Sequence, residues 1–293
     1  MQVLGHASIL AFLPRARAQT LLFTGPEGVG RRTVARWYAL GLNCPQGFPP
    51  CGQCPSCRLE PHPDYLEIAP QAETKAGRRA RLPQIRLEQI APREDGEAPS
   101  LLDWLATHPR YRAKVAVVDG AHLLNEAAAN ALLKVLEEPP AFARLILIAP
   151  SREDVLPTLA SRSLEVAFAP LPEELMRTLT QDPEVLAFAQ GSVGRARWAL
   201  EHPALFHRLV ARTEAVLEAM RKGPASTLEA LGLLLEHEEA LPYLARRLRE
   251  RLGLEAYREA LEAIQKAREA LEAYVNEELV QAWLALRLAR RLP

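Results

Sequence analysis

The sequence predicts an α/β domain with a parallel sheet, followed by a region built of helices. Three observations predict this. A short apolar strand runs directly into a glycine-rich turn, two later apolar runs have the composition of strands buried on both faces, and helical patterns alternate with these strands to about residue 167. Beyond that residue, apolar side chains recur at helical spacing to the end of the chain. The 293 residues suffice for two or three domains.

The elements of the α/β region follow from apolar runs and from the breakers between them. In the first half we expect a strand at Thr20–Thr24, a turn at Gly25–Gly30, a helix at Arg31–Leu42, a cysteine-rich loop at Cys44–Cys57, a strand at Tyr65–Ile68 and an exposed loop at Ala72–Leu82. In the second half we expect a strand at Lys114–Asp119, a helix at Glu126–Glu138 and a strand at Arg144–Ile148.

Prolines predict where the later domains begin. The pair in Pro170-Leu-Pro172 restricts the backbone and ends regular structure, and His202-Pro203 marks a second break. We therefore predict three domains, at 1–167 with an insert at 44–57, at 168–203 and at 204–293.

The composition is that of a globular protein, with 48% hydrophobic and 25% charged residues. No apolar run approaches the roughly 20 residues of a membrane span, and Met1–Leu13 lacks the pattern of a secretory signal. We expect a cytoplasmic protein without membrane contact. Lys+Arg and Asp+Glu balance at 36 each, so the net charge gives no overall bias toward nucleic acid.

All four cysteines of the chain lie within 14 residues, with the spacing C-x6-C-x2-C-x2-C. They are Cys44, Cys51, Cys54 and Cys57. Four thiolates suit a closed, tetrahedral, structural zinc site. Two disulfides are the alternative, which would be unusual in a cytoplasmic protein.

The turn between the first strand and helix has the frame of a phosphate-binding loop, with Gly25, Gly28 and Gly30. Such a loop needs a lysine for the β/γ-phosphates and a Ser/Thr hydroxyl for magnesium, but Arg31 and Arg32 stand in those places, before Thr33. Nucleotide binding at this turn is therefore doubtful, and an empty glycine-rich turn is an equal alternative.

The strand that ends at Asp119 places a carboxylate at the carboxyl edge of the sheet, where P-loop ATPases hold the metal. The next residue in active enzymes is a glutamate that polarises water, and here it is Gly120. Without that base and without the magnesium hydroxyl, hydrolysis should be slow or absent.

These motifs, in this order, resemble the AAA+ subunits of the bacterial DNA polymerase III clamp loader over at least Val3–Ser163. The resemblance is carried by the segments Leu22–Gly30 and Gly41–Cys44, the cysteine cluster, Asn130–Pro140 and Leu159–Arg162. The γ/τ motor subunits keep an intact P-loop and an Asp-Glu pair. The defects at Arg31, Arg32 and Gly120 therefore favour the δ′ branch, and glycine at the sensor position of Gly191-Ser-Val-Gly194 adds another defect.

The resemblance implies a RecA-like AAA+ domain with a zinc knuckle, a small helical lid and an all-α collar domain for oligomerisation. It implies a stator that is not catalytic alone, in a hetero-oligomer with γ/τ and δ that acts on the sliding clamp and primer-template DNA. It also implies that Arg162 reaches in trans to the neighbour's ATP as an arginine finger, although Ser163 replaces the family's usual cysteine.

Two other functions fit parts of the sequence. One is an ATP-hydrolysing motor of the γ/τ kind, which the missing lysine and glutamate disfavour. The other is a DNA-binding module in which the zinc loop and nearby Arg58, Arg78, Arg79 and Arg81 contact DNA, although these arginines could equally be solvated.

Overall fold

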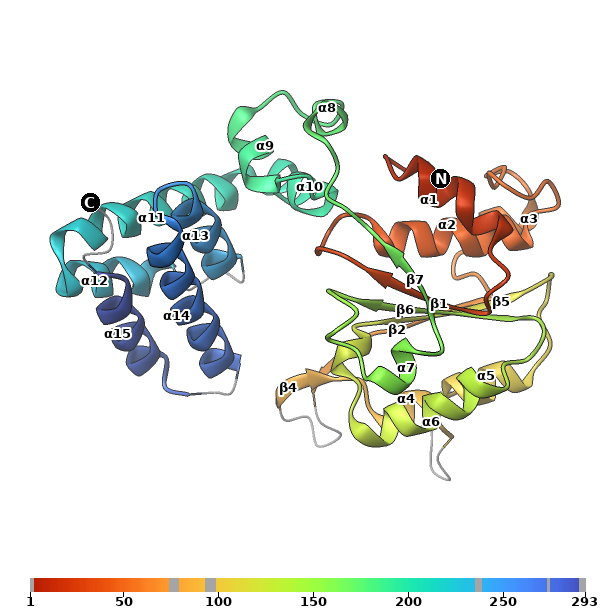
Figure 1. Ribbon diagram of the computed structural model, residues 1–293. Coiled ribbons are helices and arrows are strands. Elements are labelled where there is room, and N and C mark those ends of the chain that lie inside the picture. The colour runs from red at the N-terminus through yellow and green to blue at the C-terminus, as the bar shows by residue number, and fades with distance from the viewer. Residues whose placement is uncertain (1–2, 74–78, 93–98, 235–238, 273–274, 290–293) are drawn as a thin grey trace. The chain divides into compact units, whose positions relative to one another are not determined.

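The computed structural model describes residues 3–73, 79–92, 99–234, 239–272 and 275–289 (Figure 1). These residues form two compact units, Met1–Ala196 and Arg197–Pro293. The division falls inside helix α10 (Val193–Glu201). Segment 168–196 therefore groups with the sheet in the first unit, and the predicted division at 167 and 203 stays a prediction.

The first unit contains a five-stranded parallel sheet, which confirms the predicted α/β architecture. Its strands, in spatial order, are β2 (Tyr65–Ile68), β5 (Lys114–Asp119), β6 (Ala143–Ala149), β1 (Thr20–Thr24) and β7 (Leu164–Ala167). The three central strands are almost wholly buried, as their continuous apolar runs predict.

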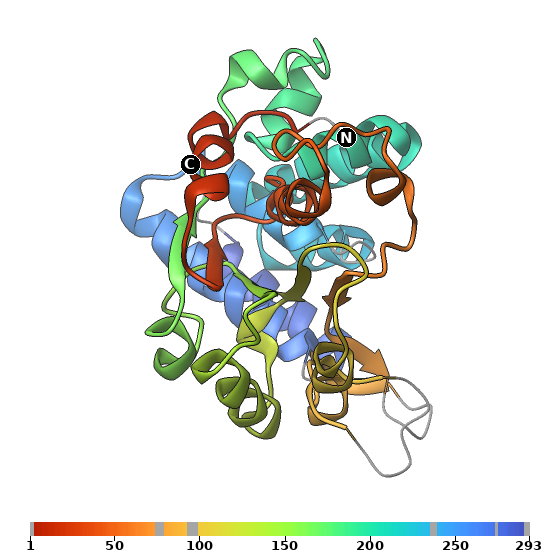
Figure 2. The ribbon, with the colours of Figure 1, turned by 90° about the vertical axis from the view of Figure 1, so that its right-hand side faces the viewer.

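Helices cover both faces of this sheet, as Figures 1 and 2 show from two directions. One layer contains α1 (Ala7–Phe12), η1 (Leu13–Arg15) and α2 (Arg31–Asn43), and the other contains α4 (Leu87–Ile90), α5 (Leu101–Ala106), η2 (Ala121–Leu123), α6 (Glu126–Glu137) and α7 (Pro157–Ala160). Alternate residues of each strand enter separate cores, so Leu22 packs in the α6 layer while Phe23 packs in the α2 layer.

The predicted exposed loop at residues 72–82 is wrong in part. Strands β3 (Gln71–Glu73) and β4 (Arg79–Gln84) pair antiparallel within it. Its polar, basic composition hid the strands because a small two-stranded sheet outside the main core requires no apolar run. The first unit is completed by α3 (Pro55–Arg58) in the cysteine loop and by α8 (Glu173–Met176) and α9 (Pro183–Ala189) after the sheet.

The second unit is helical, as the periodicity predicts. It contains α11 (Pro203–Lys222), α12 (Pro224–Leu234), α13 (Ala240–Arg249), α14 (Leu254–Glu272) and α15 (Glu277–Leu288). Among the described residues, no helix is long and apolar enough to cross a membrane.

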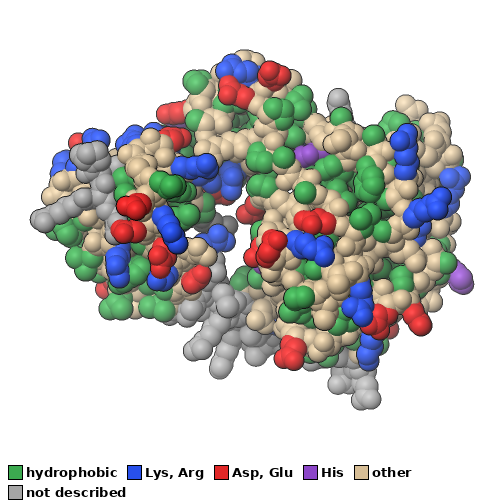
Figure 3. Space-filling view, viewed as in Figure 1, with side chains coloured by type: hydrophobic (Ala, Val, Ile, Leu, Met, Phe, Trp, Pro, Cys, Tyr) green, Lys and Arg blue, Asp and Glu red, His purple; other side chains and the backbone are tan. Residues whose placement is uncertain are grey.

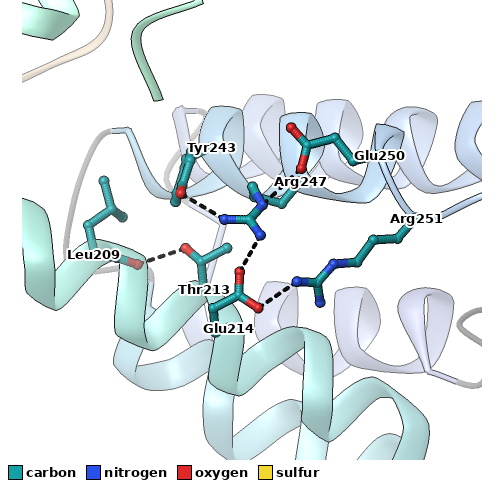
Figure 4. Close-up of polar contacts among 7 residues, drawn as sticks. All are labelled: Leu209, Thr213, Glu214, Tyr243, Arg247, Glu250 and Arg251. Carbon is teal, nitrogen blue, oxygen red and sulfur yellow. Dashed lines mark hydrogen bonds and ion pairs between the residues drawn. The ribbon is translucent and has the colours of Figure 1, made fainter. Parts of the chain in front are cut away.

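A cluster of charged side chains joins α11 to α13 in this unit (Figure 4). The carboxylate of Glu214 pairs with Arg247 at 2.8 Å and with Arg251 at 2.7 Å. Arg247 also donates to the hydroxyl of Tyr243 at 3.1 Å and pairs with Glu250 at 3.1 Å. The pKa of Arg247 is raised because these partners outweigh its desolvation by burial. The cluster stabilises the contact between the two helices.

Candidate functional site

The glycine-rich turn lies at the carboxyl end of β1 and leads into α2. Gly25, Gly28 and Gly30 have φ values of 135°, 74° and 109°, in the region that glycine alone adopts without strain. The amide of Gly25 donates to the carbonyl of Pro150 at 2.9 Å. The three glycines thus permit the left-handed backbone of this turn, which lies between a strand and a helix as the sequence predicts.

Arg31, at the position of the phosphate-binding lysine, points back to the sheet. Its guanidinium donates to the carbonyl of Ala149 at the end of β6. Burial lowers the pKa of Arg31, and the nearby carboxylates of Asp119 and Glu27 partly offset this effect. The guanidinium of Arg31 therefore makes an internal contact between α2 and β6.

Arg32 stands where the magnesium-binding hydroxyl belongs, and its guanidinium pairs with two carboxylates. It contacts Glu67 of β2 at 2.6 Å and Asp119 of β5 at 3.3 Å. Burial raises the pKa of Asp119, although Arg32 opposes this shift. A side-chain cation thus neutralises the acidic edge that a metal ion would occupy in an active P-loop enzyme.

Gly120, at the position of the missing base, has a φ of 89°, and an added Cβ would lie 3.0 Å from Cγ of Pro70. A glutamate would be strained here and would also have to displace the proline. Thr33, which follows Arg32 in α2, is exposed. The residues at this turn therefore do not fit a magnesium nucleotide. The hydroxyl that would bind magnesium, the lysine that would bind phosphate and the carboxylate base are all missing from their expected positions.

The segment Gly191–Gly194 packs directly on the glycine-rich turn. The amide of Gly194 donates to the carbonyl of Gly28 at 2.8 Å, and the buried hydroxyl of Ser192 donates to the carbonyl of Glu27 at 3.1 Å. A Cβ on Gly28 would lie 2.3 Å from Oγ of Ser192. Glycines in both segments therefore allow a close backbone contact, in the place where active relatives of the predicted family carry a sensor arginine.

The four cysteine sulfurs all lie within 4.8 Å of one another. A zinc ion with four bonds of about 2.3 Å separates its sulfurs by about 3.8 Å, so the cluster is of the right size. The four side chains are free thiols, and the alternative of two disulfides is not adopted. The donor set fits a closed tetrahedral metal site.

Backbone amides make the thiols of this cluster unequal. Donors from Gln53 and Cys54 lower the pKa of Cys51 to about 6. Burial is the main cause that raises the pKa of Cys57 to about 12. All four thiols must lose their protons to bind zinc, so metal binding should depend on pH.

Buried polar residues anchor both ends of the cysteine loop. At the start, Asn43 accepts from the amides of Arg112 and Ala113 at 2.9 Å each and donates to the carbonyl of Ala113 at 2.9 Å. At the end, His62 contacts the hydroxyl of Ser56 at 3.0 Å and accepts from the amide of Asp64 at 3.1 Å. The loop is thereby tied to the segment before β2 and to the entry of β5.

Arg162 is exposed at the end of α7. Its guanidinium pairs with Glu137 of α6 at 2.9 Å and donates to the carbonyl of Thr158 at 3.1 Å. The hydroxyl of Ser163, in the place of the family's usual cysteine, donates to the carbonyl of Leu159 at 2.8 Å. The substitution thus keeps a local contact and leaves the arginine presented to solvent.

Sequence reasoning missed the partners of the predicted residues, namely Glu67, Glu137 and Ser192. A charged residue within the apolar strand Tyr65–Ile68 was a signal for Glu67. The contact of Glu137 depends on how α6 packs beside α7, and that of Ser192 on how residues 191–194 pack on the glycine-rich turn, which the sequence pattern does not encode.

Of the four arginines of the DNA-binding alternative, the structure describes the side chain of Arg58 alone, so this alternative stays untested. Arg58 is exposed at the end of α3, whereas Arg78 and the side chains of Arg79 and Arg81 lie outside the described residues. Figure 3 shows Lys/Arg and Asp/Glu side chains interspersed on the face that it presents. No extended basic surface is visible on the described residues of that face.

Comparisons with known proteins agree with the fold and with the predicted family. The curated relatives include the δ′ subunit of Pseudomonas aeruginosa DNA polymerase III, which is 33% identical over 192 residues, covering 60% of this chain and 53% of that subunit. They also include the τ/γ subunit of Haemophilus influenzae, 31% identical over 193 residues, covering 61% of this chain and 26% of that subunit. The chain spans about half the length of the first and about a quarter of the second.

A solved structure of a DNA polymerase III γ subunit-related protein from Thermotoga maritima has the same fold, with a TM-score of 0.53 and 20% identity, covering 97% of this chain and 98% of that one. The family model described as DNA polymerase III, delta subunit, matches residues 14–172, more than half of the chain. The chain therefore belongs to the DNA polymerase III delta-subunit family, with relatives of both the δ′ and the γ/τ kind.

Proposed function

We propose that this chain is the stator of a clamp loader of the δ′ kind, a subunit that does not hydrolyse ATP but acts on the ATP site of its neighbour. In this proposal it assembles in the cytoplasm with γ/τ and δ subunits and helps to load a sliding clamp onto primer-template DNA. The family membership and the δ′ relatives support this role. The cysteine cluster holds a structural zinc ion.

One observation carries the proposal. At the chain's own nucleotide position, Arg32 pairs with two carboxylates and Gly194 bonds to Gly28, whereas the exposed Arg162 has one carboxylate partner and one backbone acceptor. A guanidinium delivered in trans to a transferring phosphoryl group stabilises the charge that develops on it, an effect of roughly 10³–10⁵ in rate for arginine fingers. The bound nucleotide that it serves belongs to the neighbouring subunit.

The second unit supplies the collar in this proposal. Helix α15 buries Val280 and Leu284 on one face, yet Leu279 and Leu286 are each 68% exposed. A helix that is apolar on more than one face is suited to contact other subunits.

The test is Arg162→Ala in the complete reconstituted complex. Clamp loading and the share of DNA-stimulated ATP hydrolysis that belongs to the adjacent site should both fall, while the complex still assembles. The matched control is Arg152→Ala, because the side chains of Arg152 and Arg162 are both 40% exposed and both pair with a glutamate. Equal rates for wild type and Arg162→Ala would remove the finger assignment.

The alternative of a γ/τ-like motor is tested on the isolated chain with magnesium and ATP. We expect neither binding nor hydrolysis, because Arg32 occupies the acidic edge and Gly194 lies on the turn. Hydrolysis that Arg31→Ala abolishes would establish a motor with an unusual P-loop.

A further inference from the structure

The side chain of Arg162 is oriented by two different acceptors. Nη1 donates to the carbonyl of Thr158, one turn earlier in the same chain segment, at 3.1 Å. Nη2 donates to Oε1 of Glu137, at the end of α6, at 2.9 Å. The first acceptor is backbone and survives any substitution of a side chain. The second is a single carboxylate that comes from another helix.

The backbone beneath Arg162 is already fixed. Leu159 and Ala160 are buried in the core under α7, and the amide of Arg162 donates to the carbonyl of Leu159 at 3.2 Å. The hydroxyl of Ser163 adds a bond to the same carbonyl. The long side chain therefore holds the remaining conformational freedom, and its contacts decide where the guanidinium points.

A guanidinium has five N–H donors, of which these two contacts use two. Three donors are left from which phosphate oxygens can accept. The side chains of Glu137 and Arg162 are 54% and 40% exposed, so their attraction is screened by water and does not trap the arginine. The arrangement holds the guanidinium in place and leaves donors available.

We propose that Glu137 is the positioning residue of the Arg162 finger. The inference rests on the proposed function, because it assigns to Glu137 the task of orienting a group that acts on a neighbour's phosphoryl transfer. Glu137 itself does not touch the nucleotide. Its carboxylate limits the rotamers of Arg162, so that less ordering is required when the phosphate arrives.

The experiment measures ATP hydrolysis by the complete complex on primed DNA with three variants of this chain. For Glu137→Ala we expect kcat at the adjacent site to fall about 5-fold, the upper range for loss of an exposed ion pair, with KM for ATP unchanged. Glu137→Gln keeps an acceptor oxygen and should recover most of the rate. Glu138→Ala is the matched control, because Glu138 is the next residue and is likewise exposed.

Two results would overturn the inference. One is an unchanged or increased kcat in Glu137→Ala, and the other is a rise in KM with kcat preserved. A double variant of Glu137→Ala with Arg162→Ala should be no slower than Arg162→Ala alone, since Glu137 acts only through the arginine. If Arg162→Ala reduces the rate but Glu137→Ala does not, the arginine-finger proposal is supported and the positioning role of Glu137 is wrong. If Arg162→Ala has no effect, the proposed function fails first.

Discussion

The glycine-rich turn, after β1, and the Arg162 segment, before β7, lie at opposite edges of the same sheet and differ in the contacts that hold their arginines. At the turn, Arg31 donates to a backbone carbonyl and Arg32 pairs with two carboxylates. The amide of Gly194 also donates to a carbonyl of the turn. After α7, Arg162 pairs with a single carboxylate, that of the exposed Glu137. The turn is thus held by several contacts from separate elements, whereas Arg162 has one side-chain partner.

The comparison teaches that loss of a motif need not leave an empty site. Arg31, Arg32 and Gly194, which stand in the places of catalytic groups, each make a contact within the folded chain. The following predictions test whether the contacts at the turn stabilise the fold, and whether their loss leaves the Arg162 segment unchanged. They begin with the largest expected effect.

Removal of metal from the cysteine cluster should affect the first region far more than the second. Helix α2 joins the glycine-rich turn to Cys44, so loss of the metal should loosen α2 from its end. Structural zinc sites in small peptides contribute on the order of 10 kcal/mol, and we expect a loss of several kcal/mol here. Hydrogen exchange after chelation, or in Cys54→Ser, should show lost protection in α2 and preserved protection in α7. Equal loss in both helices would contradict the separation of the two regions.

Acidification should release the same metal, because protons compete for the four thiolates. Burial raises the pKa of Cys57 to about 12 and backbone amides lower that of Cys51 to about 6, so Cys57 is reprotonated more readily than Cys51 once the metal leaves. Metal content measured against pH provides the check.

Gly28→Ala should destabilise the first unit by about 2 kcal/mol, since the new Cβ would meet Oγ of Ser192 at a backbone angle that disfavours alanine. The control is Gly47→Ala, because Gly47 has the same φ of 74° but no atom within 4 Å of an added Cβ. Thermal unfolding of the two variants separates strain from crowding. Equal losses would mean that the contact with Ser192 contributes nothing.

Arg32→Thr should have the smallest effect, below about 1 kcal/mol, because the side chain of Arg32 is 64% exposed. Burial already raises the pKa of Asp119, and loss of the guanidinium should raise it further. The folded variant then holds a proton that the unfolded chain releases, so its deficit should appear at neutral pH and vanish as acid protonates Asp119 in both proteins.

Arg36→Thr is the control for that pH dependence, since Arg36 pairs with the 72% exposed Glu60. Its stability difference from wild type should change little over the range in which Asp119 titrates. A deficit of Arg32→Thr that persisted in acid would mean that the arginine stabilises the fold by packing.

Local sequence signals were enough for most of the first unit. Continuous apolar runs identified β1, β5 and β6, a short run interrupted by Glu67 identified β2, and the cysteine spacing identified the cluster that the structure brings together. The strands β3 and β4 escaped because no apolar periodicity marks them.

The sequence predicted which catalytic residues are missing from the site, but not the contacts that the residues in their places make. That Arg31 and Arg32 could not bind metal or phosphate normally follows from their chemistry alone. That Arg32 reaches Glu67, or that Gly194 touches Gly28, depends on the register of β2 beside β5 and on the packing of a segment about 165 residues away in sequence.

Serine at position 163 has a practical consequence. All four cysteines of the chain lie in the cluster, so a metal-loaded protein would present no other sulfhydryl to an alkylating reagent. The extent of labelling by a maleimide dye would then count vacated clusters directly. A single cysteine introduced on α15 could be coupled to a fluorophore without background, and subunit assembly could be followed in real time.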